Sequence, residues 1–192
     1  MDTSDVALDT RFFCLFKGDP GTGKSIAAAS YPGHRSNPKI GPYFIDTDRR
    51  IKSVINYWRP RGREFHYDHF SNFFQINQKL EEFMGYCPYQ TIVLDGITTT
   101  GKLLLKTMVD TREAGSKKII RGGIELNQIE DYGGEGKGLD TIINNLQVIS
   151  LRHAVNVIVT AHVLETSSSN IKTGQTTVSR SLLTGGKKVA AS

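Results

Sequence analysis

Short apolar runs alternate along the chain with longer segments whose apolar residues recur at helical spacing. The run TIVLDG, for example, is apolar at its centre and ends with an aspartate, which is typical of a strand buried on both faces of a parallel sheet. Strands are predicted at 11–17, 41–48, 64–70, 91–96 and 154–163, and helices at 25–30, 49–58, 71–86, 97–113 and 139–153. This alternation predicts an α/β fold with a mainly parallel central sheet and helices on both faces.

The remaining segments are polar and rich in glycine or serine. Residues 114–138 form a glycine-rich, charged connection that we expect to be mobile in part. Residues 165–192 are rich in Ser, Thr, Gly and Lys, which predicts a polar hairpin or loop with its turn near 172–174, followed by a helix. With 192 residues the chain suits a single domain spanning 1–192, with an N-terminal tail at 1–10.

Composition limits where this protein is expected to act. Hydrophobic residues make up 38% of the chain and charged residues 22%, as in ordinary globular proteins, and no apolar run reaches the length of a membrane span. The acidic N-terminus lacks the apolar core of a secretory signal. Cys14 and Cys87 lack metal-ligand spacing and are expected to be reduced thiols. We therefore expect a cytoplasmic protein with no membrane partner.

Positive charge is unevenly distributed, although the net charge of +5 is moderate. Six basic residues lie between 49 and 63 without one acid: Arg49, Arg50, Lys52, Arg59, Arg61 and Arg63. No acid follows residue 170, where four more basic residues occur. Such clusters indicate either an electrostatic footprint for nucleic acid or a solvated surface, and the charge pattern alone leaves both open.

The stretch GDPGTGKS joins the first predicted strand to the first predicted helix. Its spacing, Gly18-x4-Gly23-Lys24-Ser25, fits the P-loop, in which backbone N–H groups wrap a phosphate. Lys24 would contact the β- and γ-phosphates of ATP, and the Ser25 hydroxyl would bind Mg²⁺. The residues predicted to bind the nucleotide are Gly18, Asp19, Pro20, Gly21, Thr22, Gly23, Lys24, Ser25 and Ile26. The alternative is a glycine turn with an exposed lysine.

A P-loop site also needs a carboxylate at the end of a neighbouring strand to hold the metal. Asp95 ends the predicted strand at 91–96 and is the candidate, with Ser25, for the Mg²⁺ site. The alternative is that Asp95 caps the helix predicted from residue 97, since aspartate is a favoured N-cap residue.

Hydrolysis requires a further group that orients or deprotonates water. The residue after Asp95 is Gly96, so the carboxylate that many ATPases place there is absent. Asp46 and Asp48 alternate to the same side, and Asp48 falls just past the strand end, where side chains face ligands in open α/β sheets. Asp48 is therefore predicted to polarise the attacking water, unless it caps the next helix instead.

These motifs together resemble the core of the RecA-type ATPases. GDPGTGKS, FIDTD, TIVLDG, NVIVTAH and LLTGGKKVA occur in the order and roughly the spacing of that core, over nearly the whole chain. The resemblance implies a RecA-like P-loop fold that hydrolyses ATP with Mg²⁺. It implies that Asp48 is catalytic, where RecA has glutamate. It also implies that His162, where RecA has glutamine, senses the γ-phosphate, with Thr160 beside it.

The same resemblance implies two DNA-binding loops, at 116–138 and 165–184. The residues implied as DNA contacts are Lys172, Arg180, Thr184, Gly185, Gly186, Lys187 and Lys188. The two lysines at 187 and 188 have two other readings: contact with a neighbouring subunit's nucleotide, or a solvated tail.

The likeness is strongest to short RecA-core proteins of bacteriophages that act in single-strand annealing or recombination. It implies single-stranded DNA as partner and a homo-oligomer, ring or filament, with nucleotide between subunits, in the cytosol of a bacterial host. Two rivals stay open: a nucleotide-dependent switch that binds a protein partner, as helicase loaders do, and a P-loop phosphotransferase.

Overall fold

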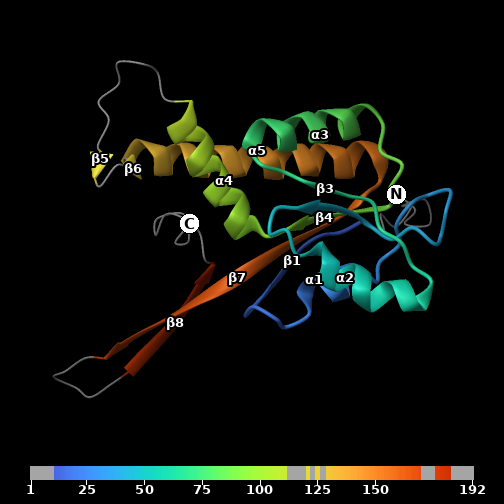
Figure 1. The fold of residues 1–192 in the computed structure, drawn as a ribbon, viewed down its shortest axis with the longest axis horizontal. Coiled ribbons are helices and arrows are strands. Elements are labelled where there is room, and N and C mark those ends of the chain that lie inside the picture. The colour runs from blue at the N-terminus through green and yellow to red at the C-terminus, as the bar shows by residue number, and fades with distance from the viewer. Residues whose placement is uncertain (1–10, 112–119, 122–123, 126–128, 170–175, 183–192) are drawn as a thin grey trace, which may run out of the picture.

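Five parallel strands form the central sheet of the structure (Figure 1). The computed structural model describes residues 11–111, 120–121, 124–125, 129–169 and 176–182. The order of the strands is β1 (Phe13–Gly18), β7 (Asn156–Ser169), β4 (Thr91–Asp95), β2 (Tyr43–Asp46) and β3 (Tyr67–His69). Each neighbouring pair in this order is parallel, which confirms the predicted α/β fold with a mainly parallel sheet.

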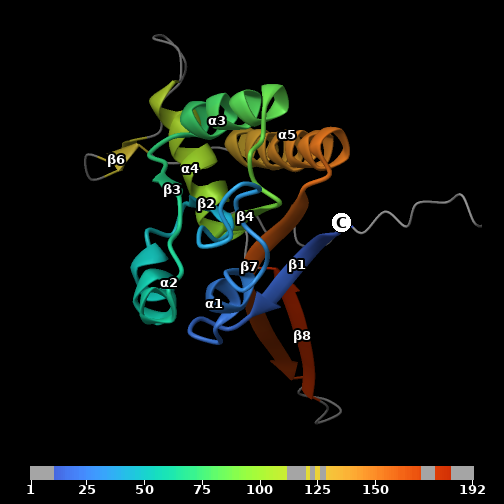
Figure 2. The same ribbon diagram turned by 90° about the vertical axis from the view of Figure 1, so that its right-hand side faces the viewer.

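Helices cover both faces of the sheet because its inner strands are apolar on both sides. Tyr43 and Ile45 of β2 belong to the core cluster that includes α3 (Phe73–Gly85), α4 (Ile97–Asp110) and α5 (Ile129–His153). Phe44 lies between them in the chain and packs in the opposite cluster, with α1 (Lys24–Ala28) and α2 (Ile51–Trp58). Figures 1 and 2 show these two helical layers on opposite sides of the strands.

The polar segment that follows the sheet forms the predicted hairpin. β7 continues past the sheet, and its residues Val163–Ser169 pair antiparallel with β8 (Thr176–Leu182). Figure 1 shows this ribbon projecting beyond the rest of the structure. The predicted turn near 172–174 and the helix predicted after it lie outside the described residues.

The prediction of a loop over 116–138 is wrong from residue 129 onward. α5 begins at Ile129, so residues 129–138 are helical, and two short strands, β5 (Ile120–Arg121) and β6 (Ile124–Glu125), pair before it. The glycines of this stretch serve helix packing. A Cβ at Gly138 would lie 2.5 Å from Leu104 Cδ2 of α4, and one at Gly134 would lie 2.9 Å from Met108 Sδ. Glycine therefore lets α5 approach α4 closely.

The bounds of the shorter helices can be compared with the prediction. α3 begins where predicted, and the Asn72 side chain caps it by accepting a hydrogen bond from the backbone N–H of Gln75 at 3.0 Å. α1 is shorter than the predicted 25–30 and ends at Ala28. Across the part of the chain that the structure describes, none of the helices has the length and apolar character needed to cross a bilayer.

Candidate active site

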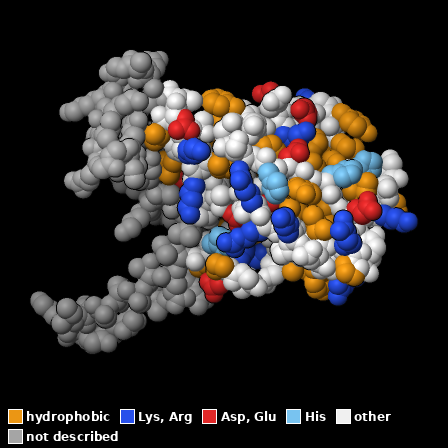
Figure 3. Space-filling view, in the orientation of Figure 1, with side chains coloured by type: hydrophobic (Ala, Val, Ile, Leu, Met, Phe, Trp, Pro, Cys, Tyr) orange, Lys and Arg blue, Asp and Glu red, His pale blue; other side chains and the backbone are white. Residues whose placement is uncertain are grey.

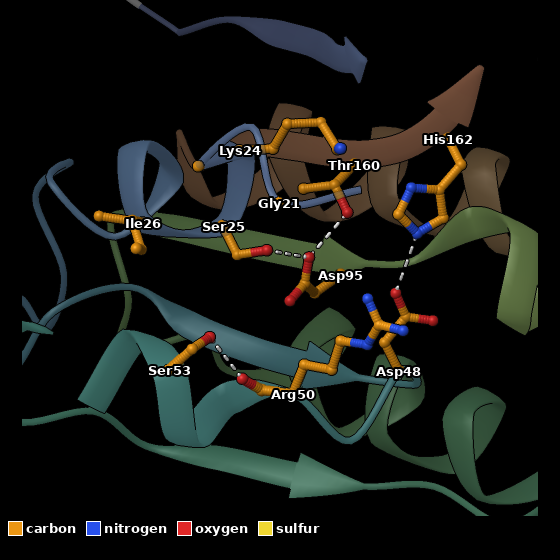
Figure 4. A pocket seen from close by; sticks show the side chains of 11 residues that line it. Gly21, Lys24, Ser25, Ile26, Asp48, Arg50, Ser53, Asp95, Thr160 and His162 are labelled. Atoms are coloured by element: carbon orange, nitrogen blue, oxygen red, sulfur yellow. Dashed lines mark hydrogen bonds and ion pairs between the residues drawn. The ribbon is translucent and has the colours of Figure 1, made fainter. Parts of the chain in front are cut away.

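A pocket lies where the carboxyl ends of the parallel strands meet (Figure 4). β1 ends at Gly18, β2 at Asp46 and β4 at Asp95, while His162 of β7 is the register partner of Gly18. This edge of an open α/β sheet is where ligands bind. The pocket has a volume of about 260 Å³ and is lined by Gly21, Gly23, Lys24, Ser25, Ile26, Asp48, Arg50, Ser53, Asp95, Thr160 and His162.

The glycine loop between β1 and α1 is held in a tight curve by its own polar groups. Gly21 and Gly23 have φ of 81° and 82°, which side chains with a Cβ rarely adopt. The Lys24 ammonium donates hydrogen bonds to the backbone oxygens of Gly18 at 2.9 Å and Asp19 at 2.8 Å. Thr22 donates its hydroxyl to Asp19 O as well, at 2.9 Å. The Lys24 side chain therefore folds back over the loop, and Lys24 also lines the pocket.

The structure brings part of the predicted loop into the pocket. Gly21, Gly23, Lys24, Ser25 and Ile26 line it. Gly18, Asp19, Pro20 and Thr22 complete the loop without being among the lining residues. Gly18 has no positive φ, and a Cβ there would lie 3.2 Å from Thr22 Oγ1, so Gly18 provides room rather than an unusual backbone angle.

Asp95 lies at the bottom of the pocket and joins three elements. Its Oδ1 accepts hydrogen bonds from Ser25 Oγ and from Thr160 Oγ1, each at 2.7 Å. Thr160 in turn accepts a hydrogen bond from the backbone N–H of Gly96 at 2.9 Å. α4 begins after Gly96 with no side-chain cap. Asp95 is therefore directed at the P-loop, and the alternative in which it caps α4 is wrong.

The free oxygen of Asp95 fits a cation. Asp95 Oδ2 is buried and has no hydrogen-bond partner among the described residues. Burial raises the pKa of Asp95, hydrogen bonds from Ser25 and Thr160 oppose this rise, and the nearby carboxylates of Asp46 and Asp48 add to it. A carboxylate oxygen and a hydroxyl are ligands that Mg²⁺ prefers, and the ion commonly takes its other ligands from phosphates and water. Ser25 and Asp95 therefore fit a magnesium ion that arrives with a nucleotide.

Asp48 occupies the far side of the same pocket, two residues beyond the end of β2. Its Oδ1 accepts a hydrogen bond from Thr99 Oγ1 in the first turn of α4, and its Oδ2 lies 3.5 Å from His162 Nε2. Gly96 makes room for it, because a Cβ at Gly96 would lie 2.6 Å from Asp48 Oδ1. The carboxylate of Asp48 thus lies beside the residue that follows Asp95.

The helix-capping role considered for Asp48 belongs to Asp46. The Asp46 carboxylate is buried and accepts hydrogen bonds from the backbone N–H groups of Arg50 at 3.1 Å and Ile51 at 3.2 Å, at the start of α2. Its Oδ2 also lies 3.0 Å from His69 Nδ1. The Asp46 carboxylate is thus used to hold the start of α2, whereas Asp48 faces the pocket.

His162 lies where the central sheet passes into the hairpin. Its Nε2 faces Asp48, and its buried Nδ1 has no hydrogen-bond partner among the described residues. Figure 4 shows His162 and Lys24 on one side of the pocket, with Asp48 and Arg50 on the other. The next residue, Val163, is the first of β7 to pair with β8.

Thr99, Arg50 and Ser53 belong to the site but were not predicted from the sequence. Arg50 and Ser53 line the pocket from the start of α2, and Thr99 contacts Asp48. Each is polar and lies within a few residues of Asp48 or Asp95 in the sequence, and this proximity is the only sequence feature that could have pointed to them. Threonines and arginines are too common near helix starts for that signal to distinguish them.

The basic residues predicted as a nucleic-acid footprint have different surroundings. Arg63 donates hydrogen bonds to the backbone oxygens of Ser30, at 2.8 Å, and Tyr31, and burial lowers its pKa. The guanidinium of Arg61 lies 4.0 Å from the centre of the Tyr57 ring. Figure 3 shows Lys and Arg side chains spread over one face among apolar and uncharged ones.

The predicted DNA contacts are not tested by the described side chains. Arg180 lies in β8, where its register partner on β7 is Glu165. The other six predicted contacts lie outside the described residues: Lys172, Thr184, Gly185, Gly186, Lys187 and Lys188.

Comparison with known proteins places this site in a family. No curated protein matches the chain. A family model described as an AAA domain matches residues 12–191, which include the glycine loop, all five strands of the parallel sheet and the hairpin. The match agrees with the P-loop at the end of β1 and with the parallel sheet flanked by helices. The chain therefore belongs to the AAA domain family of P-loop nucleotide-binding ATPases.

Proposed function

We propose that the protein binds ATP with Mg²⁺ in this pocket, hydrolyses it, and couples the cycle to single-stranded DNA as a head-to-tail oligomer. The observation that supports hydrolysis most directly is the pair of carboxylates with separate partners. Asp95 is hydrogen-bonded to Ser25 of the P-loop, and Asp48 lies across the pocket beside His162. Two carboxylates with different surroundings can serve two roles, one toward a metal and one toward water.

Nucleotide binding would exchange one set of polar contacts for another. Lys24 gives up the backbone oxygens of Gly18 and Asp19 and takes phosphate oxygens in their place. Gly21 and Gly23 present backbone without a Cβ to the same phosphates. The pocket of about 260 Å³ is slightly smaller than the roughly 300–1,000 Å³ of most ligand clefts. We therefore expect it to hold the phosphates, with the base outside it.

Ser25 Oγ and Asp95 Oδ2 would hold the metal in the proposed complex. Magnesium supplies charge neutralisation and polarisation of the phosphoryl group when it is bound. The support from this chain is the buried Asp95 Oδ2, which has no partner among the described residues and which a cation would satisfy. A bound cation would also offset the repulsion between the Asp95 carboxylate and those of Asp46 and Asp48.

Asp48 is the proposed group that activates water. Its carboxylate accepts a proton from a water molecule whose oxygen attacks the γ-phosphorus. The bond from that phosphorus to the β–γ bridging oxygen breaks, which leaves ADP and phosphate. Thr99 and His162 contact one carboxylate oxygen each and keep Asp48 oriented toward the pocket.

The link to DNA is proposed through β7. His162 lies beside Asp48, and the hairpin pairing starts at the following residue, Val163. A change at the terminal phosphate would therefore reach the hairpin along one continuous strand. No acid follows residue 170 in the sequence, so contact with DNA phosphates is favoured there and should weaken as salt is raised.

Magnesium-dependent ATP hydrolysis, measured with and without single-stranded DNA, tests this proposal. Lys24→Ala should abolish nucleotide binding, whereas Lys17→Ala, an exposed lysine outside the pocket, should not. DNA retention is recorded at low and moderate salt, and the oligomeric state by sedimentation with and without ATP. Turnover that DNA does not stimulate, together with no ATP-dependent DNA retention, would favour the partner-binding switch.

Asp48→Asn tests the catalytic assignment separately. The variant should bind ATP as tightly as the wild type and lose turnover by about 100-fold or more, because the amide cannot take a proton from water. Single-turnover kinetics after pre-binding ATP would measure this loss directly. Unchanged turnover in Asp48→Asn would remove Asp48 from the mechanism.

A further inference from the structure

Arg50 is a second cation in the pocket, next to Lys24. It lines the pocket from the start of α2, and Figure 4 shows its guanidinium extended toward the Asp48 side. Its side chain makes no hydrogen bond or ion pair with any residue that the structure describes. An arginine that lines a pocket without a carboxylate partner has all its donors available to a ligand.

The backbone around Arg50 is fixed from several sides. Arg49 has a φ of 55°, in the left-handed region that residues other than glycine rarely adopt. The Arg50 N–H donates to the Asp46 carboxylate at 3.1 Å, and its carbonyl accepts from Ser53 Oγ at 2.9 Å. His69 lies 3.0 Å from the same carboxylate of Asp46. An unfavourable backbone angle held by buried contacts often marks a functional position.

Arg50 differs from the neighbouring basic residues in where it lies. Arg63 is tied to backbone oxygens of Ser30 and Tyr31, and Arg61 lies over Tyr57. Arg59 is exposed and does not line the pocket. In the basic cluster at 49–63, Arg50 alone is among the lining residues of this pocket.

The position of Arg50 suits charge that develops on a transferring phosphoryl group. The carboxylates of Asp48 and Asp95 line the pocket. Arg50 and Lys24 are the arginine and the lysine among its lining residues. Lys24 approaches from the P-loop, whereas Arg50 approaches from the side of Asp48, where water would be activated. A guanidinium can contact two phosphate oxygens at once and remains charged at any working pH.

We propose that Arg50 contacts the terminal phosphate of the bound nucleoside triphosphate and stabilises the charge that forms there during hydrolysis. This inference rests on the proposed function, since it needs a triphosphate in the pocket. It makes Arg50 a catalytic residue supplied by the same chain as the P-loop.

Arg50→Ala, Arg50→Lys and the matched control Arg59→Ala test this inference without DNA. The readouts are the affinities for ADP and for a slowly hydrolysed ATP analogue, both with Mg²⁺, and the single-turnover hydrolysis rate. Arg50→Ala should leave ADP affinity within about twofold, weaken the ATP analogue about tenfold or more, and slow hydrolysis by about 100-fold. Arg50→Lys should recover part of the binding and little of the rate. Arg59→Ala should match the wild type.

Two results overturn the inference. One is equal weakening of ADP and the ATP analogue, which would place Arg50 away from the terminal phosphate. The other is an Arg50→Ala variant whose hydrolysis rate and nucleotide affinities equal those of Arg59→Ala. Thermal unfolding of each variant separates these results from misfolding, and Arg50→Lys keeps the test valid if the alanine variant unfolds. If the wild type neither binds nor hydrolyses ATP, the proposed function and this inference both fail. If Lys24→Ala loses nucleotide binding as expected but the Arg50 variants behave like Arg59→Ala, the proposed function stands and only the inference fails.

Discussion

Gly96 and the Asp48 carboxylate pack closely against each other just beyond the ends of β4 and β2. Gly96 has a φ of 99°, and a Cβ on it would lie 2.6 Å from Asp48 Oδ1. The backbone angle and the missing side chain both favour glycine here. Asp48, two residues beyond the end of the neighbouring β2, places its carboxylate beside the residue that follows Asp95. The glycine is therefore part of how Asp48 reaches the pocket.

Gly96→Ala and Gly62→Ala separate backbone strain from displacement of Asp48. Both glycines have positive φ, but a Cβ at Gly62 would meet nothing within 4 Å. Gly62→Ala should lower the free energy of unfolding by about 1–2 kcal/mol, from the left-handed angle alone, with turnover unchanged. Gly96→Ala should lose a further 1–3 kcal/mol, roughly, from crowding, and turnover should fall about tenfold or more. Denaturant unfolding and ATPase assays measure the two effects. Equal turnover in both variants would contradict this account.

At this scale the sequence predicted the motif residues and missed the contacts between distant ones. The spacing of GDPGTGKS predicted the loop, and the position of two aspartates after apolar strands predicted Asp48 and Asp95, which both line the pocket. The hydrogen bond from Thr160 to Asp95 joins residues 65 positions apart and depends on β7 lying beside β4. That neighbourhood is a property of strand order, which hydrophobic periodicity does not reveal.

At the scale of elements, the α4–α5 contact shows how glycine can mislead. Helix propensity and the run GGEGKG predicted a loop, yet residues 129–138 are helical. The competing effect is tertiary: Gly134 and Gly138, one helical turn apart, lie against Met108 and Leu104 of α4. The strands of the parallel sheet and the helices α3 and α4 were predictable because burial pattern and propensity agree there.

Alanine substitutions along α5 should therefore have opposite effects. Gly133→Ala meets nothing within 4 Å and should stabilise the protein by up to about 1 kcal/mol through helix propensity. Gly138→Ala would crowd the buried Leu104, with a closest approach of 2.5 Å. We expect a net loss of about 1–2 kcal/mol there, because overpacking outweighs propensity. Chemical denaturation would measure both changes, and stabilisation by Gly138→Ala would refute close packing of the two helices.

At the scale of the whole molecule, three aspartates lie close together at the carboxyl edge of the sheet, next to its buried apolar residues. Asp46 and Asp95 are buried, and Asp48 lies nearby. Burial and repulsion from the carboxylates of Asp46 and Asp48 make the ionised form of Asp95 unfavourable. Hydrogen bonds from Ser25 and Thr160 offset this cost only in part, so Asp95 lowers the stability of the fold until a cation binds, as is common in binding sites.

Asp95→Asn should show this cost through the pH dependence of stability. Because the folded pKa of Asp95 is raised, its protonated form contributes stability below its ordinary value near 4. That contribution is lost as the pH rises through the raised value. Without Mg²⁺ and nucleotide, the melting temperature of Asp95→Asn should therefore rise relative to wild type as the pH is raised above about 4. Mg²⁺ with ATP should raise the melting temperature of the wild type more than that of the variant. Parallel pH profiles for the two proteins would contradict this prediction.

β7 also divides the molecule into parts that can open separately. Its residues 157–159 have strand neighbours on both sides, whereas residues 163–169 pair with β8. Backbone amides in the first part should exchange with solvent only on global unfolding, and those in the second part through local fraying. His162 lies at the boundary between these two regimes. Fraying of the ribbon would thus stop at the residue that contacts Asp48, so the ribbon can order or loosen while the sheet stays intact.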